Sequence, residues 1–524
     1  MREEARGNRA VTSAYDEMRT PDGCLRPAYK RLGKALGSLA PAEIDARSAA
    51  LMSTFTDRGV TFNVGGSGDE RPFPLDLVPR VLSVDEWQVV EAGVRQRVRA
   101  LEAFLADVYG PGRCFDDGVL PRRLVTSSRH LNRAAQGIVP VNGVRIHVAG
   151  IDLVRDAAGQ FRVLEDNIRV PSGVSYVIEN RRAMSRVFAD VMAQHRVRPV
   201  SSYPSRLLSA LRRTAPAHAQ EPTVVLLTPG AYNSAYFEHS LLARLMGVEL
   251  VEGRDLHCRG NEVFMRTTTG ERRVDVIYRR VDDEFLDPLH SRPDSVVGCA
   301  GLMNAVRAGN VTVANAIGNG VADDKLTYTW VPQLIRFYLG EEPILPNVDT
   351  YRLEDDADRA YALDHLAELV LKPVDGSGGY GIVIGPESTS RQLAHTRRKV
   401  LDNPRGWIAQ PVVQLSTVPT LVDGHLAPRH VDLRPFAVND GDNIWVLPGG
   451  LTRVALPEGS LIVNSSQGGG SKDTWVLAPP GSGVPGDTAE PRPDAWPVPS
   501  PAPTPRFAPQ QGQQQQQASG GARC

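Results

Sequence analysis

Apolar and polar residues recur with helical spacing over residues 83–109. The apolar stripe of this segment consists of Val90, Val94, Val98, Leu101 and Leu105. Ser83 and Glu86 stand three residues apart at its start, as the hydroxyl and carboxylate of a capping box do. The spacing predicts an amphipathic helix that begins after Ser83. Two more helices are predicted, one from Ala40 onward and one over residues 323–340, which Asp323 and Asp324 open.

A period of two predicts a β-hairpin over residues 144–167. The runs VRIHVAGIDLV and FRVLEDN have strand composition, and the turn-forming segment RDAAGQ separates them. Residues 200–320 instead show a strand, a helix that ends at Gly247 and a second strand, VELVEG. This order predicts a βαβ unit in a Rossmann-like region. Later short strands are predicted from the runs LVLKPV, GIVIG and WIAQPVV.

Composition narrows the class of protein. The 524 residues are 41% hydrophobic and 23% charged, with a net charge of −1. At roughly 100–200 residues per domain, this length predicts two to four domains. The charge balance argues against a nucleic-acid-binding surface. No run of about 20 apolar residues predicts a membrane span, and the charged N-terminus does not resemble a signal peptide.

The five cysteines and the C-terminal segment add two expectations. The cysteines lie far apart and form no CxxC pair, so reduced thiols and a cytoplasmic location are expected. Residues 479–524 are rich in Pro and Gln, and this composition predicts disorder. Such a tail is either inert or a site for a protein partner.

A glycine-rich segment lies between two predicted strands. Gly376, Gly378 and Gly381 satisfy the pattern GxGxxG, but a strand follows them where a dinucleotide-binding fold needs a helix. No GK[ST] sequence closes the loop as in a Walker A motif, and no HRD or DFG motif supports a protein kinase. Glycines between strands let backbone N–H groups approach phosphate oxygens. The alternative is an ordinary glycine-rich hairpin.

Lys372 lies on the strand that enters the glycine loop, and Pro373 beside it predicts that this strand end lies at an edge. A lysine in this position can contact a phosphate group. A solvated lysine that protects the sheet edge is the alternative. We favour the phosphate contact because the glycine loop is adjacent.

Three oxygen-bearing side chains are expected on one face of the hairpin. Glu165 and Asn167 are two residues apart on one strand, and Asp152 lies on the other strand. Pairing of residue 156 with 161 places Asp152 opposite Glu165, whereas pairing of 154 with 161 places it diagonally. Two carboxylates and an amide oxygen are hard ligands that suit Mg²⁺. A solvated polar face is the alternative.

These motifs resemble one family. The carboxylate hairpin, the glycine loop and the phrases EDNIRVPSGVSYVIENR, VADDKLTY and LPEGSLIVNSSQGGGSKDTWVL are similar to the type 2 group of circularly permuted ATP-grasp proteins, which are related to glutathionylspermidine synthase. The resemblance covers roughly residues 50–478. It implies a mixed α+β and α/β fold, a permuted ATP-grasp with an inserted Rossmann-like pre-ATP-grasp domain. The implied segments are a helical arm (1–50), a segment with the metal hairpin (51–195), the Rossmann-like substrate domain (196–320), a nucleotide-binding segment (321–478) and the tail (479–524).

The resemblance also implies roles for individual residues. Asp152, Glu165 and Asn167 match the Mg²⁺ ligands, and Lys325 and Lys372 match the phosphate-binding lysines. The flexible loop corresponds to Gly376, Ser377, Gly378, Gly379, Tyr380 and Gly381. Gln410 stands at the adenine edge, where many relatives have Glu. Arg434 and Arg453 lie where strands approach the phosphates and are the candidate catalytic residues with Lys372. Pairing of these arginines with Asp432 or Glu458 is the structural alternative.

The implied activity is ATP-dependent ligation of a carboxylate to an amine or a thiol through an acyl phosphate. ATP, Mg²⁺ and small-molecule or peptide acids and amines would be the ligands. A phosphotransferase and a non-catalytic nucleotide-binding scaffold are the alternatives. Arg169 and residues 172–175 follow the hairpin, where they contact substrate or form a structural turn.

Overall fold

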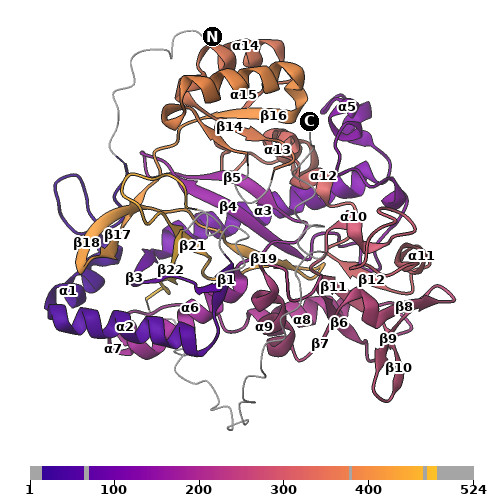
Figure 1. Cartoon of the computed structure of the whole chain (residues 1–524), viewed down its shortest axis with the longest axis horizontal. Coiled ribbons are helices and arrows are strands. Elements are labelled where there is room, and N and C mark those ends of the chain that lie inside the picture. Colours follow the sequence, from indigo (N-terminus) through magenta and orange to yellow (C-terminus); the bar gives the residue numbers. More distant parts are fainter. Residues whose placement is uncertain (1–13, 64–69, 377–380, 464–468, 481–524) are drawn as a thin grey trace.

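The computed structural model describes residues 14–63, 70–376, 381–463 and 469–480. It is a mixed α+β structure in which the described strands form seven sheets. Figure 1 shows a lobe with α14 and α15 at the top of the molecule, above a larger body. The body contains the N-terminal helices, the predicted hairpin and the parallel sheet. The predicted tail beyond residue 480 lies outside the described residues.

The predicted hairpin forms the edge of a four-stranded sheet with the order β20-β19-β4-β5. Its strands are β4 (Val148–Arg155), β5 (Phe161–Asn167), β19 (Phe436–Asn439) and β20 (Ile444–Val446). β19 pairs antiparallel with β4, so a segment near the end of the chain supports the hairpin. A second sheet, β21-β22-β3, joins β3 (Leu75–Leu82) in parallel to β22 (Gly470–Val476), with β21 (Thr452–Val454) at its edge.

The amphipathic helix is confirmed as α3 (Val84–Val108). The Ser83 hydroxyl accepts the Glu86 N–H at 3.3 Å, and the Glu86 carboxylate accepts the Ser83 N–H at 2.8 Å. All five residues of the predicted stripe are buried. α3 packs against α13 (Lys325–Leu339), the helix predicted over 323–340, whose N-cap is Asp324.

The predicted βαβ unit is also confirmed. β6 (Val224–Leu227), β7 (Glu249–Val251), β11 (Val276–Arg279) and β12 (Thr312–Ala314) form a parallel sheet with the order β12-β11-β6-β7. Between β6 and β7 the chain forms α9 (Tyr236–Met246), which Gly247 ends with a φ of 68°. This positive φ suits glycine because it has no Cβ.

The upper lobe holds the later predicted strands. Its sheet has the order β13-β16-β14-β15, with β13 (Tyr351–Arg352), β14 (Leu369–Pro373), β15 (Val383–Ile384) and β16 (Trp407–Pro411). α14 (Asp356–Asp364) and α15 (Ser390–Asp402) cover this sheet (Figure 1). β14 is an interior strand, whereas Lys372 and Pro373 at its end pair only with β16 among the described strands. The edge predicted from Pro373 is therefore present on one side only.

Smaller elements complete the described chain. The remaining strands are β1 (Thr61–Asn63), β2 (Glu70–Pro72), β8 (Leu256–Arg259), β9 (Glu262–Thr267), β10 (Gly270–Val274), β17 (Thr417–Val422) and β18 (His425–His430). The remaining α-helices are α1 (Lys30–Ser38), α2 (Pro41–Asp57), α4 (Arg113–Asp116), α5 (Arg122–Thr126), α6 (Val174–Val187), α7 (Ala189–Ala193), α8 (Tyr203–Arg213), α10 (Asp283–Leu286), α11 (Leu302–Arg307) and α12 (Gly320–Asp323). Short 3-10 turns span Pro27–Tyr29, Arg133–Ala135, Gly253–Asp255, Leu366–Glu368, Gly385–Glu387 and Pro404–Gly406. α2 is the helix predicted after Ala40, and it continues beyond residue 50.

Candidate functional site

The hairpin places Asp152, Glu165 and Asn167 on one face. Asp152 lies directly opposite Glu165, and Gly150 lies opposite Asn167. The turn closes with Arg155 opposite Phe161, a pairing that neither predicted register included. An irregularity between Asp152 and Leu153 shifts the pairing by one residue. Because such a shift moves side chains to the other face, it restores Asp152 to the face of Glu165.

Two arginines hold the carboxylate of Asp152. The Arg434 guanidinium binds both carboxylate oxygens, with its Nη2 2.8 Å from Oδ2, and Arg453 Nη2 lies 2.8 Å from the same Oδ2. Asp152 is 2% exposed. Burial raises the pKa of this carboxyl, but the two guanidinium groups outweigh burial and lower its pKa to about 2. Asp152 is therefore a rigid, fully charged group at the floor of the site.

Arg453 also pairs with Asp432, as the structural alternative predicted. Its Nε lies 2.9 Å from Asp432 Oδ2. Asp432 is 1% exposed, and burial raises its pKa despite the pairing with Arg453. Arg434, by contrast, pairs with Asp152, not with Asp432. Both arginines thus contact the carboxylate of the hairpin rather than standing free.

The two lysines predicted to bind phosphate lie near the same face but differ in their partners. Lys325, the first residue of α13, has its Nζ 3.2 Å from Glu165 Oε1 and also donates to the Gly376 carbonyl. The ammonium group of Lys372 has no ion-pair or hydrogen-bond partner among the described residues, although the backbone of this residue pairs with Ile408 in β16. Burial lowers the pKa of Lys372 to about 8, with Lys325 adding to the effect and Glu165 opposing it.

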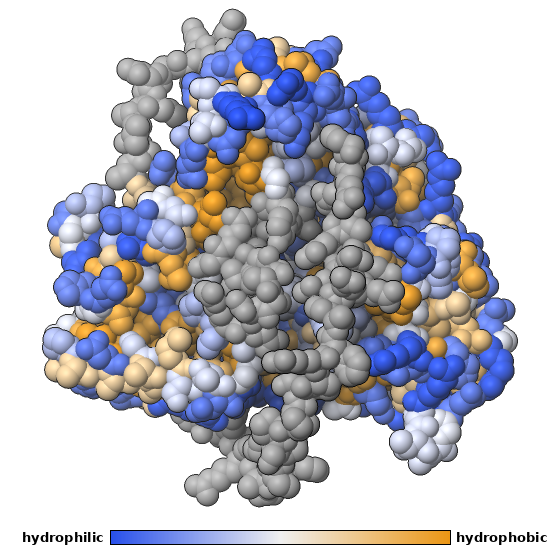
Figure 2. All heavy atoms as spheres, in the orientation of Figure 1, coloured by the Kyte–Doolittle hydropathy of each residue, from blue (hydrophilic) through white to orange (hydrophobic). Residues whose placement is uncertain are grey.

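Both lysines line a cavity of about 200 Å³ between the upper lobe and the body, whereas Asn167 and Arg434 are not among its described lining residues. The charged and amide side chains on its wall are Asp152, Glu165, Lys325, Lys372, Gln410, Asp432 and Arg453. The apolar part of the wall includes Val370, Ile384, Ile408, Val413, Leu415 and Leu461. Figure 2 shows hydrophobic residues in a hollow beneath the lobe of α14 and α15. The site therefore combines an apolar slot with a cluster of charges.

The structure describes only part of the glycine loop. Gly376 and Gly381 flank it between β14 and β15, where the sequence predicted it. Ser377, Gly378, Gly379 and Tyr380 lie outside the described residues. Gly381 has a φ of 76°, and a Cβ there would lie 2.9 Å from Pro373 Cγ, so this position requires glycine.

The comparisons with known proteins address the same region. The sequence profile described as circularly permuted ATP-grasp type 2 matches residues 79–455. The chain belongs to this family. The match spans the hairpin, the parallel sheet and the upper lobe, and the hairpin precedes this lobe in the chain. The predicted family and fold class are thus confirmed.

Relatives cover most of the chain. An uncharacterized protein of Mycobacterium tuberculosis is 64% identical over 466 residues, which are 89% of this chain and 84% of the relative. An uncharacterized protein of Synechocystis is 52% identical over 88% of this chain and 97% of its own length. A Frankia casuarinae protein, provisionally named glutamate–cysteine ligase 2-2, is 46% identical over 88% of this chain. This chain spans 54% of that longer protein.

One solved structure supports the fold alone. A glutathione synthetase like-effector from Globodera pallida, in its apo form, has a TM-score of 0.51 at 10% identity. The alignment covers 84% of this ATP-grasp chain and 98% of the effector.

The hairpin residues fit a magnesium ion in their chemistry. Two carboxylates and one amide share a face, and these are oxygen donors of the type that Mg²⁺ prefers. Arg434 and Arg453 already neutralise Asp152, and Lys325 pairs with Glu165, so a bound ion would have to displace part of these contacts. The amide nitrogen of Asn167 is buried without a hydrogen-bond partner among the described residues. The described residues hold no group of three or more His, Cys, Asp or Glu side chains arranged for a metal. Asn167 would therefore have to complete the ligand set.

Gln410 lies on β16 and is 2% exposed. Its Nε2 donates to Thr350 Oγ1 at 2.9 Å, which leaves its carbonyl oxygen as an acceptor toward the cavity. A glutamine in this orientation can accept a hydrogen bond from an amino group, as a carboxylate would.

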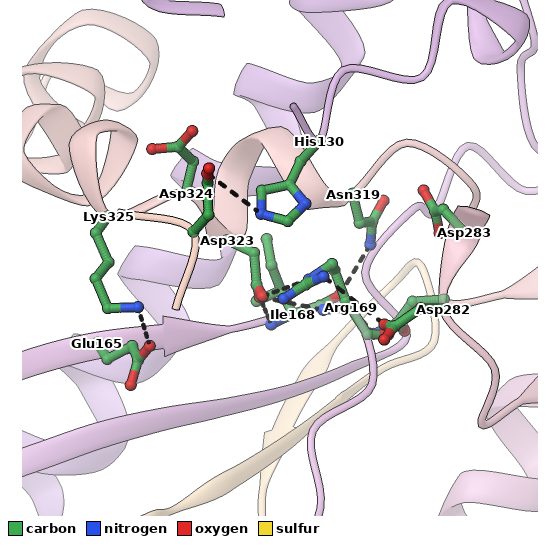
Figure 3. A network of polar contacts seen from close by, with 12 residues as sticks. His130, Glu165, Ile168, Arg169, Asp282, Asp283, Asn319, Asp323, Asp324 and Lys325 are labelled. Atoms are coloured by element: carbon green, nitrogen blue, oxygen red, sulfur yellow. Dashed lines mark hydrogen bonds and ion pairs between the residues drawn. The ribbon is translucent and has the colours of Figure 1, made fainter. Parts of the chain in front are cut away.

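Next to the hairpin lies a polar network that the sequence did not predict as a unit (Figure 3). Arg169 Nε donates to Asp323 Oδ2 at 2.7 Å, and its Nη1 lies 3.7 Å from Asp282 Oδ1. Asp323 Oδ1 also accepts the Ile168 N–H at 2.6 Å. Arg169 thus joins the end of the hairpin to α12 and to Asp282 at the start of α10. Its partners lie more than 100 residues away, so no local pattern could reveal them.

Of the described residues, none forms a helix that is both long enough and apolar enough to cross a membrane.

Proposed function

We propose that this chain is an ATP-dependent ligase that joins a carboxylate to an amine or a thiol through an acyl phosphate. The observation that carries the proposal is the unpaired ammonium group of Lys372. Its ammonium faces a cavity, has lost part of its solvation and has no counter-ion among the described residues. Because an unpaired cation with reduced solvation is costly, such a position suits an anionic ligand.

The cavity wall suits a nucleoside triphosphate. The apolar part, with Ile408 and Val413 among its side chains, would enclose the adenine, and the carbonyl oxygen of Gln410 would accept its amino group. Lys325 and Lys372 would contact the phosphates. Asp152, Glu165 and Asn167 would hold Mg²⁺, which would neutralise part of the phosphate charge when bound.

The reaction needs no covalent attachment to the protein. A carboxylate oxygen of the acid attacks the γ-phosphorus, and ADP leaves with the electrons of the broken P–O bond. The amine or thiol then attacks the acyl carbon, loses its proton and displaces inorganic phosphate. Arg453 lines the cavity, where it would neutralise charge on the transferring phosphoryl group, and Arg434 would hold Asp152 in place. Exclusion of water protects the acyl phosphate from hydrolysis.

Calorimetry of ATP binding with Mg²⁺ tests the nucleotide site. We expect binding by the wild type and a loss of about tenfold or more in Lys372→Met. Lys399→Met removes an exposed lysine from α15 of the same lobe and serves as the matched control, with unchanged affinity expected. Absence of ATP binding by the wild type at millimolar concentration would overturn the proposal.

Product analysis tests the reaction class. ADP release is measured with pooled acids and amines, and the products are analysed by mass spectrometry. An amide or thioester that appears with ADP and phosphate supports the ligase. A stable phosphorylated product without ligation indicates a phosphotransferase, and binding without turnover indicates a scaffold.

A further inference from the structure

Two cysteines in the region of the parallel sheet lie side by side. Cys258 is in β8, and Cys299 lies shortly before α11. Their Sγ atoms are 3.6 Å apart, although 41 residues separate them in the chain. Cys299 is 2% exposed, whereas Cys258 is half-buried. A disulfide bond requires about 2.05 Å between the sulfurs, so the two thiols stand in contact without being bonded.

The backbones that carry the two thiols are tightly packed. A Cβ on Gly253, just before β8, would lie 2.3 Å from the carbonyl oxygen of Gly298. A Cβ on Gly301 would lie 3.2 Å from the Cβ of Cys258. The Cys299 N–H donates to the Leu286 carbonyl at 2.9 Å. These contacts hold the sulfurs near each other, so a bond needs only a small side-chain rotation.

The two thiols differ in a way that assigns their order of reaction. The hydrogen bond from the Cys299 thiol lowers the pKa of Cys258. The same hydrogen bond, together with burial, raises the pKa of Cys299. Because the thiolate is the nucleophile, the more accessible Cys258 would react first and Cys299 second.

We propose that Cys258 and Cys299 are a redox-active pair that forms a reversible disulfide when a peroxide oxidises the protein. The Cys258 thiolate attacks one peroxide oxygen, the O–O bond breaks, and Cys258 becomes a sulfenic acid while water forms. The Cys299 thiol then attacks the Cys258 sulfur and expels a second water, as its proton joins the departing hydroxide. The two thiols lose two electrons, and the peroxide gains them.

A disulfide between Cys258 and Cys299 would constrain α10, which lies next to the polar network around Arg169. Cys299 is hydrogen-bonded to Leu286, the last residue of α10, and α10 begins with Asp283. Asp283 accepts the Gly318 N–H at 2.6 Å, and its neighbour Asp282 faces Arg169 (Figure 3). A disulfide would therefore fix β8 to the turn that presents these carboxylates.

Peptide mapping tests the pair in the full chain. The reduced protein is treated with hydrogen peroxide, free thiols are alkylated, and the digest is analysed by mass spectrometry. We expect a cross-linked peptide that contains Cys258 and Cys299, about 2 Da lighter than its two reduced parts, which dithiothreitol separates. Cys258→Ser and Cys299→Ser should abolish it. Cys114→Ser removes another buried thiol and should leave it unchanged.

A trapping experiment separates the two roles. In Cys299→Ser, Cys258 should stop at the sulfenic acid and react with dimedone, whereas in Cys258→Ser the remaining Cys299 should stay reduced. Hydrogen exchange in residues 283–303 should slow in the oxidised wild type only. The proposal is overturned if both thiols remain alkylatable after peroxide, or if Cys258 is converted to a sulfinic acid without a cross-link in the wild type.

Discussion

Lys325 Nζ lies 3.2 Å from Oε1 of Glu165, so a lysine predicted to hold phosphate pairs with a glutamate predicted to hold a metal. Lys325 also donates to the carbonyl of Gly376, next to the glycine loop. In the absence of bound ligands, the ammonium of Lys325 and the carboxylate of Glu165 therefore neutralise each other. Under the proposed function, binding of ATP and Mg²⁺ breaks this ion pair, because Lys325 then contacts a phosphate group and Glu165 contacts the metal.

Removal of the Glu165 charge should make the affinity for ATP independent of Mg²⁺. In Glu165→Gln, Lys325 loses its counter-ion and a negative charge no longer faces the nucleotide. Affinity for ATP in the absence of Mg²⁺ should therefore be equal to or higher than that of the wild type, whereas the gain on adding Mg²⁺ should disappear. Calorimetry with and without Mg²⁺ measures both quantities. Glu368→Gln, at an exposed site of the same lobe, should behave as the wild type does.

Nucleotide affinity should depend on the protonation of Lys372. Its pKa of about 8 in the free protein means that the ammonium begins to lose its proton just above neutral pH. A bound phosphate favours the charged form and raises this pKa, so binding at pH 8 takes up a proton. Affinity should fall as the pH rises above 8. Calorimetry in buffers of different ionisation enthalpy detects the uptake, and an equal uptake in Lys372→Met would contradict the assignment.

Arg453 should be a major contributor to stability. Its removal in Arg453→Met leaves Asp152 with one partner and Asp432 buried without its principal cation. The free energy of unfolding should drop by about 3–5 kcal/mol, as measured in urea. Arg99→Met, which removes a half-exposed arginine that pairs with Glu341, should cost no more than about 1 kcal/mol. Adding Asp432→Asn to Arg453→Met should cost less than the two single changes together.

Acid should weaken the fold through Glu17. This carboxylate is fully buried against Arg80, with Nη2 2.6 Å from Oε1. Burial alone would raise its pKa, but Arg80 and Arg155 lower it to about 2. Because the folded pKa lies below the unfolded value, the contribution is complete above about pH 4.5 and is lost as the pH falls toward 2.

Urea unfolding between pH 6 and pH 3 measures this contribution. Glu17→Gln should flatten the pH dependence of the free energy of unfolding. If this single change prevents folding, the double variant Glu17→Gln/Arg80→Met is measured instead. Asp45→Asn, on the exposed surface of α2, should leave the profile unchanged. If the free energy of unfolding of the Glu17 variant falls as steeply with acid as that of the wild type, other carboxylates cause the acid sensitivity.

Gly93 should tolerate no side chain although it lies within α3. A Cβ there would stand 2.4 Å from Leu345 Cγ, and Leu345 is 3% exposed. Gly93→Ala should destabilise the protein by about 1–3 kcal/mol despite the gain in helix propensity. Gly37→Ala, in α1 with open space around it, should instead be neutral or stabilise by up to about 1 kcal/mol. Thermal unfolding of the two variants gives the comparison.

Much of the fold was predictable because its signals are local. The capping box of Ser83 and Glu86, the stripe of α3 and the alternation of the hairpin depend on residues within one or two turns or strands. The same locality places the glycine loop between β14 and β15. Glu165 and Asn167 share a face because the side-chain period along a strand is two, whereas Asp152 joins them only through the one-residue shift beside it.

The sequence by itself therefore determined the elements, the family and the set of charged residues near the hairpin. Only the tertiary structure decided which charges neutralise each other. Arg434 and Arg453 meet Asp152 across 282 and 301 residues, and the one-residue shift beside Asp152 depends on the strands that pair with it. Lys372, in contrast, is left without a counter-ion in the part of the chain that the structure describes. Ion pairing depends on distances between side chains from remote segments, and the periodicity of residues along the sequence contains no information about those distances.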